Sequence, residues 1–208
     1  MPLLTMRLIS INSGKAGPLF ANQHLDRTVV MSGIKKSSIS NIDQASPVDI
    51  NALGVIGDEQ ADLTVHGGIE KAIYVYPREH YPFWNALLLR ELKTPFDLQP
   101  GAMGENFTIT GLLEADVFVG DTLQIGDLEF IVTKLREPCF KFNAKMRYKG
   151  AAKAMLQSGH CGWYMRVITP GKLMAGNAIN LLPGKQETSI ADQVRAIMKR
   201  EMQGDLWD

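Results

Sequence analysis

The sequence predicts a mainly β fold with peripheral helices, an α+β arrangement, and three observations lead to this prediction. Nineteen glycines and ten prolines punctuate short apolar runs, a pattern typical of strands joined by turns. Apolar residues at helical spacing occur in only a few stretches. Hydrophobic residues make up 45% and charged residues 21% of the 208 residues, which is an ordinary globular composition with enough apolar side chains for a buried core.

Eight segments are expected to be strands, because each is a short apolar run bounded by turn residues. Gly126-Asp127 separates two of them and predicts a two-residue hairpin. In chain order, the expected strands are Leu4–Ile11, Val29–Ile34, Ala72–Tyr76, Phe107–Thr110, Thr122–Ile125, Leu128–Leu135, Trp163–Thr169 and Ala178–Leu182.

Three helices are expected around these strands. The first runs from Pro77 to about Leu92, since proline is tolerated where the first N–H groups have no intrahelical partner. The second is Ala151–Gln157. The third, Ile190–Met202, has apolar residues at helical spacing, and Ser189 is its expected N-cap.

Pro183-Gly184-Lys185 marks the expected domain boundary. Residues 1–183 form the predicted β-rich domain. Residues 184–208 form a short C-terminal helical extension, which is too short to be a domain of its own.

Charge and cysteine content narrow the classes of function. The 22 basic and 22 acidic residues give a net charge of zero. The chain therefore lacks the overall excess of positive charge that is typical of a nucleic-acid binder. Two cysteines are too few for a disulfide framework and favour a reducing compartment. No basic region precedes the first apolar stretch, and no run approaches the ~20 apolar residues of a membrane-spanning helix. We therefore expect a cytoplasmic protein that binds neither nucleic acid nor membrane.

The first segment with candidate catalytic or binding residues lies between Gly57 and Lys71 and contains Asp58. Its His66-Gly67-Gly68 turn has backbone N–H groups that can approach a ligand without a Cβ in the way, and such turns form anion-binding nests. Lys71 adds a point charge suited to phosphate. The alternative is a plain glycine turn with exposed His66 and Lys71.

The second segment contains Gly104-Glu105-Asn106 in a tight turn before an expected strand. Glu105 and Asn106 have the acceptors and donors needed to hydrogen-bond a heterocycle. The alternative is a loop in which Asn106 satisfies its own backbone.

The third segment places Cys139 after Pro138, with Arg136 and Lys141 on either side. These cations would stabilise a thiolate, and a thiolate suits soft or high-valent transition metals. The alternative is a buried structural cysteine. Cys161 is expected to be structural, following the usual burial of free cysteine. The adjacent His160 points the opposite way on an extended chain, so the two rarely share a ligand.

Taken together and in order, these segments are far more specific than any one alone. The matching residues are Gly57-Asp58-Glu59-Gln60-Ala61, His66-Gly67-Gly68 with Lys71, Tyr76-Pro77-Arg78-Glu79-His80-Tyr81 with Trp84, Gly104-Glu105-Asn106 with Gly111-Leu112, Gly120-Asp121, Arg136-Glu137-Pro138-Cys139-Phe140-Lys141, Gly162-Trp163 and Pro170-Gly171. Through them, roughly residues 5–183 resemble the MOSC domain family, named for the C-terminal domain of molybdenum cofactor sulfurases. The likeness is greatest to its stand-alone bacterial, YiiM-like branch. Glu137 and Phe142 depart from the expected small polar residue and leucine.

The resemblance implies a MOSC-type β-barrel that binds the molybdenum cofactor, a pterin dithiolene phosphate that holds molybdenum. It implies that Cys139 is the metal ligand and that Asp58 donates a proton or orients a partner. The implied cofactor-binding residues are His66, Gly67, Gly68 and Lys71 at the anionic end, Gly104, Glu105 and Asn106 at the pterin, and Arg136 and Lys141 at the thiolate or phosphate.

The implied activity is the reduction of N-hydroxylated compounds, including hydroxylamino purines and amidoximes, which would detoxify base analogues. The chain has neither a dinucleotide-binding glycine fingerprint nor a cysteine set for an iron–sulfur cluster, so a separate flavin or iron–sulfur reductase is expected to supply electrons. One alternative is a non-catalytic carrier of cofactor or sulfur, and another is an interaction domain without a cofactor. Relatives often carry a three-helix appendage, whereas about 25 residues follow Pro183 here, so a shortened appendage is expected.

Overall fold

An eight-stranded sheet forms the centre of the fold in the computed structural model, which describes residues 6–20, 29–60 and 67–203. Its strands lie in the order β13 (Ile179–Leu182), β9 (Thr122–Ile125), β10 (Leu128–Leu135), β11 (Trp163–Thr169), β7 (Ile73–Pro77), β8 (Phe107–Thr110), β1 (Arg7–Ser13) and β4 (Ser37–Asn41). Neighbouring strands are antiparallel, except that β7 and β8 are parallel.

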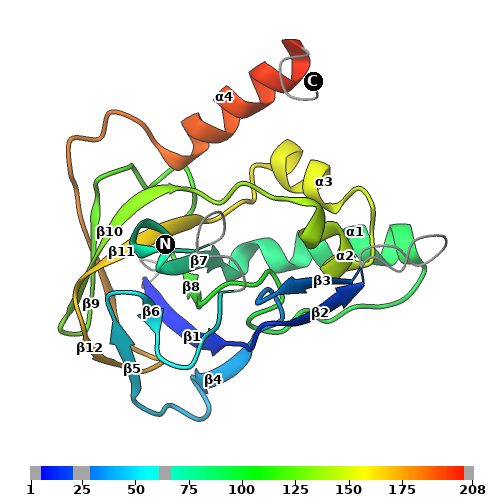
Figure 1. Ribbon diagram of the computed structural model, residues 1–208. Coiled ribbons are helices and arrows are strands. Elements are labelled where there is room, and N and C mark those ends of the chain that lie inside the picture. Colours follow the sequence, from blue (N-terminus) through cyan, green and yellow to red (C-terminus); the bar gives the residue numbers. More distant parts are fainter. Residues whose placement is uncertain (1–5, 21–28, 61–66, 204–208) are drawn as a thin grey trace.

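The sheet curls into a half-barrel (Figure 1). Backbone hydrogen bonds link the β13 edge to the region of β1, the strand next to the β4 edge. They run from the Ile179 N–H to the Met6 carbonyl at 2.9 Å and from the Leu8 N–H to the Asn177 carbonyl at 3.0 Å. The mainly β, barrel-like fold predicted from the sequence is therefore confirmed.

Two small sheets accompany the half-barrel. One contains β12 (Gly171–Leu173), β5 (Val48–Asn51) and β6 (Gly54–Val55), and the other pairs β2 (Gly17–Phe20) with β3 (Val29–Ser32). The sequence did not predict β2, β4, β5, β6 or β12. These strands are two to five residues long, which is too short for an alternating pattern to stand out from the surrounding loops.

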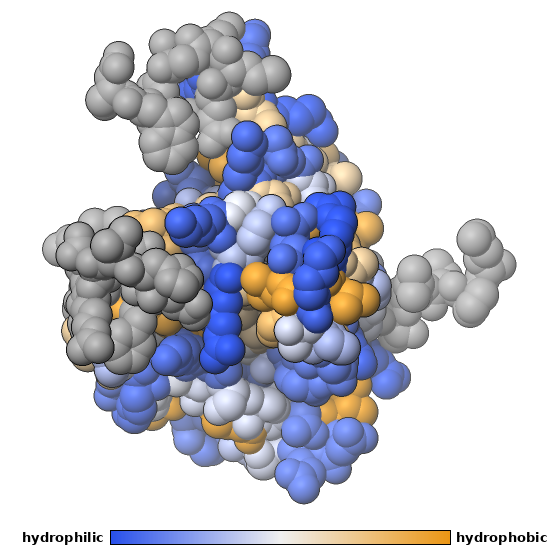
Figure 2. Space-filling model, turned by 90° about the vertical axis from the view of Figure 1, so that its right-hand side faces the viewer, coloured by the Kyte–Doolittle hydropathy of each residue, from blue (hydrophilic) through white to orange (hydrophobic). Residues whose placement is uncertain are grey.

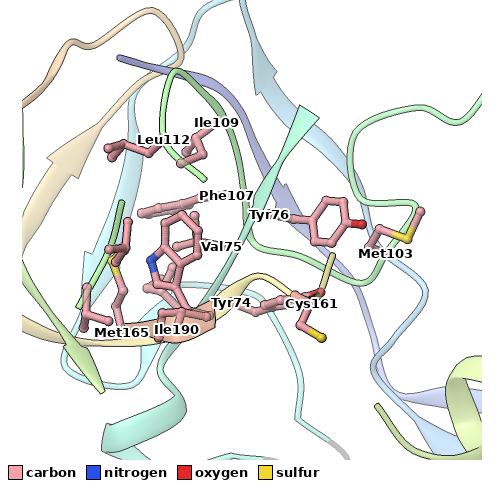
Figure 3. Close-up of a cluster of buried hydrophobic side chains, with 14 of the residues drawn as sticks. Tyr74, Val75, Tyr76, Met103, Phe107, Ile109, Leu112, Cys161, Met165 and Ile190 are labelled. Atoms are coloured by element: carbon pink, nitrogen blue, oxygen red, sulfur yellow. Dashed lines mark hydrogen bonds between the residues drawn. The ribbon is translucent and has the colours of Figure 1, made fainter. Parts of the chain in front are cut away.

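The core lies inside the curled sheet and under its helices. Phe107 and Phe130 are fully buried and meet edge to face, with ring centroids 5.5 Å apart. Residues 73–76 of β7 are all buried, as expected for a central strand covered on both faces. Figure 3 shows this cluster, in which side chains from β7 and β8 lie with Met165 and Ile190, two residues from much later in the sequence. The apolar side chains therefore fix β7 and β8, which lead to the site described below.

Four α-helices lie outside the sheet in the described part of the chain (Figure 1): α1 (Tyr81–Leu92), α2 (Phe140–Met146), α3 (Ala151–Ser158) and α4 (Ile190–Gln203). Short 3-10 turns, η1 (Ile69–Lys71) and η2 (Arg78–His80), precede β7 and α1. The predicted helix Ala151–Gln157 matches α3, which ends one residue later. The sequence also predicted α4 with its cap, because the Asp192 N–H donates to the Ser189 hydroxyl at 3.0 Å. None of these helices combines the length and apolarity required to cross a bilayer.

Two helix predictions need correction. Pro77 ends β7, and α1 begins only at Tyr81, so that Pro82 falls in the first turn, where no N–H is needed. The sequence predicted no helix after Pro138, yet α2 begins at Phe140 with Cys139 as its N-cap residue. Only seven residues long, α2 is too short to show a periodic pattern.

Candidate functional site

A cavity beside β7, β10 and β11 brings together segments that are far apart in the sequence. Seven of the eleven predicted site residues line it: Asp58, Lys71, Gly104, Asn106, Arg136, Cys139 and Lys141. Lys36, Gln60, Tyr74 and Tyr164 also line it. The cavity therefore has a thiol, four cationic side chains and several hydrogen-bonding groups in its walls.

Cys139 stands where β10 gives way to α2. β10 ends at Leu135. Pro138 follows three residues later, and Cys139 then adopts an extended backbone as the residue before α2. Its side chain is partly exposed and makes no capping hydrogen bond to the helix. The thiol is therefore accessible at the cavity wall.

Arg136 is a buried cation without a carboxylate partner among the described residues. It is 5% exposed, and its guanidinium lies over the rings of Tyr74 and Phe142, at 5.5 and 5.0 Å from their centroids. Its Nη1 is 3.5 Å from the sulfur of Met155. A buried charge is costly unless an opposite charge compensates it. The wall next to Cys139 is therefore suited to a thiolate or an anionic ligand.

Asp58 belongs to a buried ion pair that no sequence motif indicates. Its carboxylate accepts hydrogen bonds from Lys36, from the Gly14 N–H at 2.9 Å and from the Asn106 amide at 2.9 Å. The Lys36 and Asp58 side chains are 7% and 5% exposed. Burial lowers the pKa of Lys36, and the nearby Asp58 carboxylate opposes that shift. No local pattern marks Lys36, since the contact depends on a fold that joins distant loops.

Asn106, the hydrogen-bond partner of Asp58, holds the same part of the cavity wall in place. Its side-chain oxygen accepts the Tyr74 N–H at 3.1 Å, while its own N–H donates to the Tyr74 carbonyl at 2.8 Å. Its carbonyl accepts the Asn12 N–H at 2.7 Å. Asn106 therefore links β1, β7 and Asp58, and we name the set Lys36, Asp58 and Asn106 the polar brace.

Glu105 lies behind the cavity wall and does not line it. Its fully buried carboxylate accepts the Tyr81 hydroxyl, the Gly101 and Met103 N–H groups at 2.9 Å, and the Thr108 hydroxyl at 2.9 Å. Burial raises the pKa of Glu105, and these hydrogen bonds act in the opposite direction. Glu105 therefore shapes the 101–106 loop from within, and the loop presents Gly104 to the cavity.

The glycine turn lies at the edge of the site. Gly68 has a φ of 90°, which favours glycine, and its N–H donates to the Gln60 side chain at 3.2 Å. Neither Gly67 nor Gly68 lines the cavity, whereas Lys71 does. The predicted contribution of His66 lies outside the described residues.

Cys161 occupies a different environment from Cys139. It is fully buried, and its Sγ lies 3.5 Å from the Met155 carbonyl. Burial is the main cause that raises the pKa of this thiol to about 12, and the Glu114 carboxylate adds to the shift. Cys161 is therefore held as a neutral thiol, as expected of a structural cysteine.

Comparisons with known proteins identify relatives over most of the chain. The model of the MOSC domain family matches residues 62–180. The YiiM protein of Escherichia coli is 35% identical over 159 residues, covering 76% of this chain and 69% of that protein. A protein of Gibberella moniliformis described as a reductase is 37% identical over 147 residues, covering 70% of this chain but 26% of its own longer chain.

A solved structure shows the same architecture. The crystal structure of YiiM from Geobacillus stearothermophilus superposes with a TM-score of 0.69 at 30% identity, covering 92% of this chain and 83% of that one.

Proposed function

The chain belongs to the MOSC domain family, whose members are generally associated with the molybdenum cofactor, and on this premise we propose that it is a molybdenum-cofactor-dependent reductase of N-hydroxylated compounds. The single observation that carries the proposal is the accessible Cys139 thiol beside the buried Arg136, which lacks a carboxylate partner among the described residues. The similarity to a fungal protein described as a reductase supports a redox role. The proposed substrates are hydroxylamino purines and amidoximes.

The chemistry of the cavity wall fits the proposed cofactor. A thiolate is the soft ligand that suits this metal, and Lys71, Arg136 and Lys141 supply positive charge for an anionic pterin phosphate. When bound, the cofactor supplies the redox chemistry, while the protein supplies binding, orientation and electrostatics. We propose that Cys139 ligates the metal and that the turn containing His66, Gly67 and Gly68 lies near the phosphate end.

The polar brace assigns Asp58 a positioning role in this proposal. Its carboxylate already accepts hydrogen bonds from Lys36, Gly14 and Asn106, and these contacts hold it in place between two loops. Of the two roles expected for Asp58, we therefore propose the orienting one. Asn106 and Gly104 then present the 104–106 loop toward the pterin, while Glu105 supports that loop from behind.

The proposed reaction consumes two electrons and two protons. R–NHOH is converted to R–NH2 and water as the N–O bond breaks, and an amidoxime is converted to an amidine in the same way. We propose that the electrons come from a separate flavin or iron–sulfur protein, because the chain has no dinucleotide-binding fingerprint. The isolated protein should therefore not oxidise NADPH in the presence of substrate.

The test is turnover of a hydroxylamino purine with dithionite as donor, using protein from a host that overproduces the cofactor. The proposal predicts release of the amino purine, with NADPH alone giving none. Protein that is loaded with molybdenum and pterin but inactive on both substrate classes would contradict the proposed reaction and favour a cofactor carrier instead. Turnover without bound molybdenum would contradict the cofactor requirement.

A further inference from the structure

A basic surface adjoins the Cys139 cavity in a chain of zero net charge. Residues 134–153 contain seven cationic side chains and one anionic side chain. The anionic one, Glu137, lies 3.5 Å from Lys134 in an exposed ion pair. Arg147, Lys149 and Lys153 are exposed, and no ion pair joins them to another described residue. Positive charge is therefore concentrated on α2, the following turn and α3.

This surface is continuous with the cavity. Cys139 and Lys141 contribute to both the cavity and the start of α2. The Ala152 N–H donates to the Asn143 side chain at 2.7 Å, which fastens the start of α3 to α2. In Figure 1, α2 and α3 lie together at one end of the half-barrel, and Figure 2 looks onto that end, where hydrophilic residues surround an apolar patch.

An exposed aromatic side chain lies beside the metal-ligand position. Phe140 follows Cys139 directly and is 57% exposed. An apolar centre with a charged rim is the usual anatomy of a protein interface, and aromatic anchors contribute strongly to binding. We name Phe140, Lys141, Arg147, Lys149 and Lys153 the α2–α3 surface.

We propose that the α2–α3 surface docks an acidic electron-donor protein. This inference rests on the proposed function, which needs a separate donor at the Cys139 cavity. Complementary charge steers association and sets the orientation of two proteins, and electron-transfer contacts are typically small. An acidic protein is favoured over a nucleic acid because the basic residues border a redox cavity and the rest of the chain offsets their charge.

A reduced flavin satisfies the electron balance as the donor. A reduced flavin, FlH2, gives up two electrons and two protons as it becomes oxidised flavin, Fl. R–NHOH takes up the same electrons and protons to give R–NH2 and water. A flavodoxin with an acidic surface is therefore a suitable probe.

The experiment measures binding of an acidic flavodoxin to the full chain by calorimetry at low and high salt. The Lys149→Glu/Lys153→Glu double variant should bind about tenfold more weakly at low salt, because both residues lie on the charged rim. The Lys172→Glu/Lys185→Glu control has the same net charge and should bind like the unmodified protein, although Lys172→Glu also removes an exposed ion pair with Asp49. Phe140→Ala should weaken the part of the affinity that persists at high salt, since apolar contact is not screened.

Equal weakening in the two double variants, or none in either, would overturn the docking proposal. Tighter binding of duplex DNA than of flavodoxin, lost in Lys149→Glu/Lys153→Glu, would also overturn it in favour of a nucleic-acid surface. Dithionite-driven turnover should be unchanged in both double variants. Charge-dependent flavodoxin binding by a protein without such turnover would uphold the docking surface and reject the proposed reaction, so the two failures are distinguishable.

Discussion

Single residues in this protein take their properties from where the fold places them, and the two cysteines are the clearest example. Cys139 is partly exposed at a cavity that Arg136 and Lys141 also line, whereas Cys161 is fully buried with a pKa of about 12. A thiol of the first kind is accessible to a ligand in the cavity, and one of the second kind is inert at neutral pH.

Serine substitution should separate the two cysteines. Cys139→Ser should abolish reductase turnover, since a hydroxyl of high pKa is a poor ligand for this metal, while Cys161→Ser should retain most of it. The buried hydroxyl in Cys161→Ser can cost ~1–3 kcal/mol of stability if it finds no partner. Turnover is therefore normalised to folded, molybdenum-loaded protein for Cys161→Ser, and to folded protein for Cys139→Ser. Full activity in Cys139→Ser would refute the ligand assignment.

We expect His160 to make the stability of the fold depend on pH. Its ring stacks on His80 with centroids 3.8 Å apart, and its Nδ1 is buried without a hydrogen-bond partner among the described residues. His80 in turn contacts the Glu114 carboxylate at 2.8 Å. Burial, followed by the nearby His80, lowers the pKa of His160 to about 4, and Glu114 opposes the shift.

The unfolded chain therefore binds a proton at His160 that the folded chain does not, between pH 6.5 and about 4. The contribution of this residue to stability should therefore fall as the pH drops through that window. Denaturant titrations should show a smaller fall for His160→Phe, which keeps an aromatic ring but cannot titrate. An identical pH profile for the two proteins would contradict the assignment.

At the scale of elements, the polar brace holds three loops and β7 around one cavity. Asp58 accepts the Gly14 N–H after β1, and Asn106 exchanges hydrogen bonds with Tyr74 in β7. A buried ion pair is weak evidence for net stability, but removing one partner leaves an uncompensated charge.

A double-mutant cycle tests the brace. Lys36→Met and Asp58→Asn should each destabilise the protein by about 3 kcal/mol, and the double variant should be more stable than the sum of the single losses predicts. The measurement is the free energy of unfolding in urea, and the coupling should exceed about 1 kcal/mol. Simple additivity would show that the two side chains do not act as a pair.

Sequence patterns predicted the elements whose own residues form a long apolar run between turns. The strands Leu128–Leu135 and Trp163–Thr169 match β10 and β11 at both ends, because long apolar runs flanked by turns are distinctive. The serine-rich β4 was missed, since its place beside β1 depends on pairing and not on apolar content.

In the candidate site, the residues that lie close together in the sequence were predicted, and those that only the fold brings together were missed. Cys139, Arg136 and Lys141 lie close in sequence, and the fold keeps them together. Lys36 was missed because its partner is 22 residues away along the chain. Glu105 was expected to orient the pterin or line the site, but it turns inward to the 101–106 loop, which a sequence motif cannot reveal.

At the scale of the whole molecule, the curled sheet explains how one cavity collects residues between positions 32 and 164. Parallel pairing of β7 and β8 sets Asn106 beside Tyr74, and antiparallel pairing of β10 and β11 brings Tyr164 opposite Lys134, just before Arg136. A chain with zero net charge thus gathers positive side chains around one thiol. This arrangement is what the proposed anionic cofactor requires.

The most direct test of the central claim is the molybdenum and pterin content of the protein purified from a cofactor-overproducing host. The account predicts about one molybdenum and one pterin per chain, as a pocket with one thiolate ligand would hold, with molybdenum lost in Cys139→Ser and kept in Cys161→Ser. Protein that is folded and free of both molybdenum and pterin under these conditions, or that retains molybdenum fully in Cys139→Ser, would contradict it.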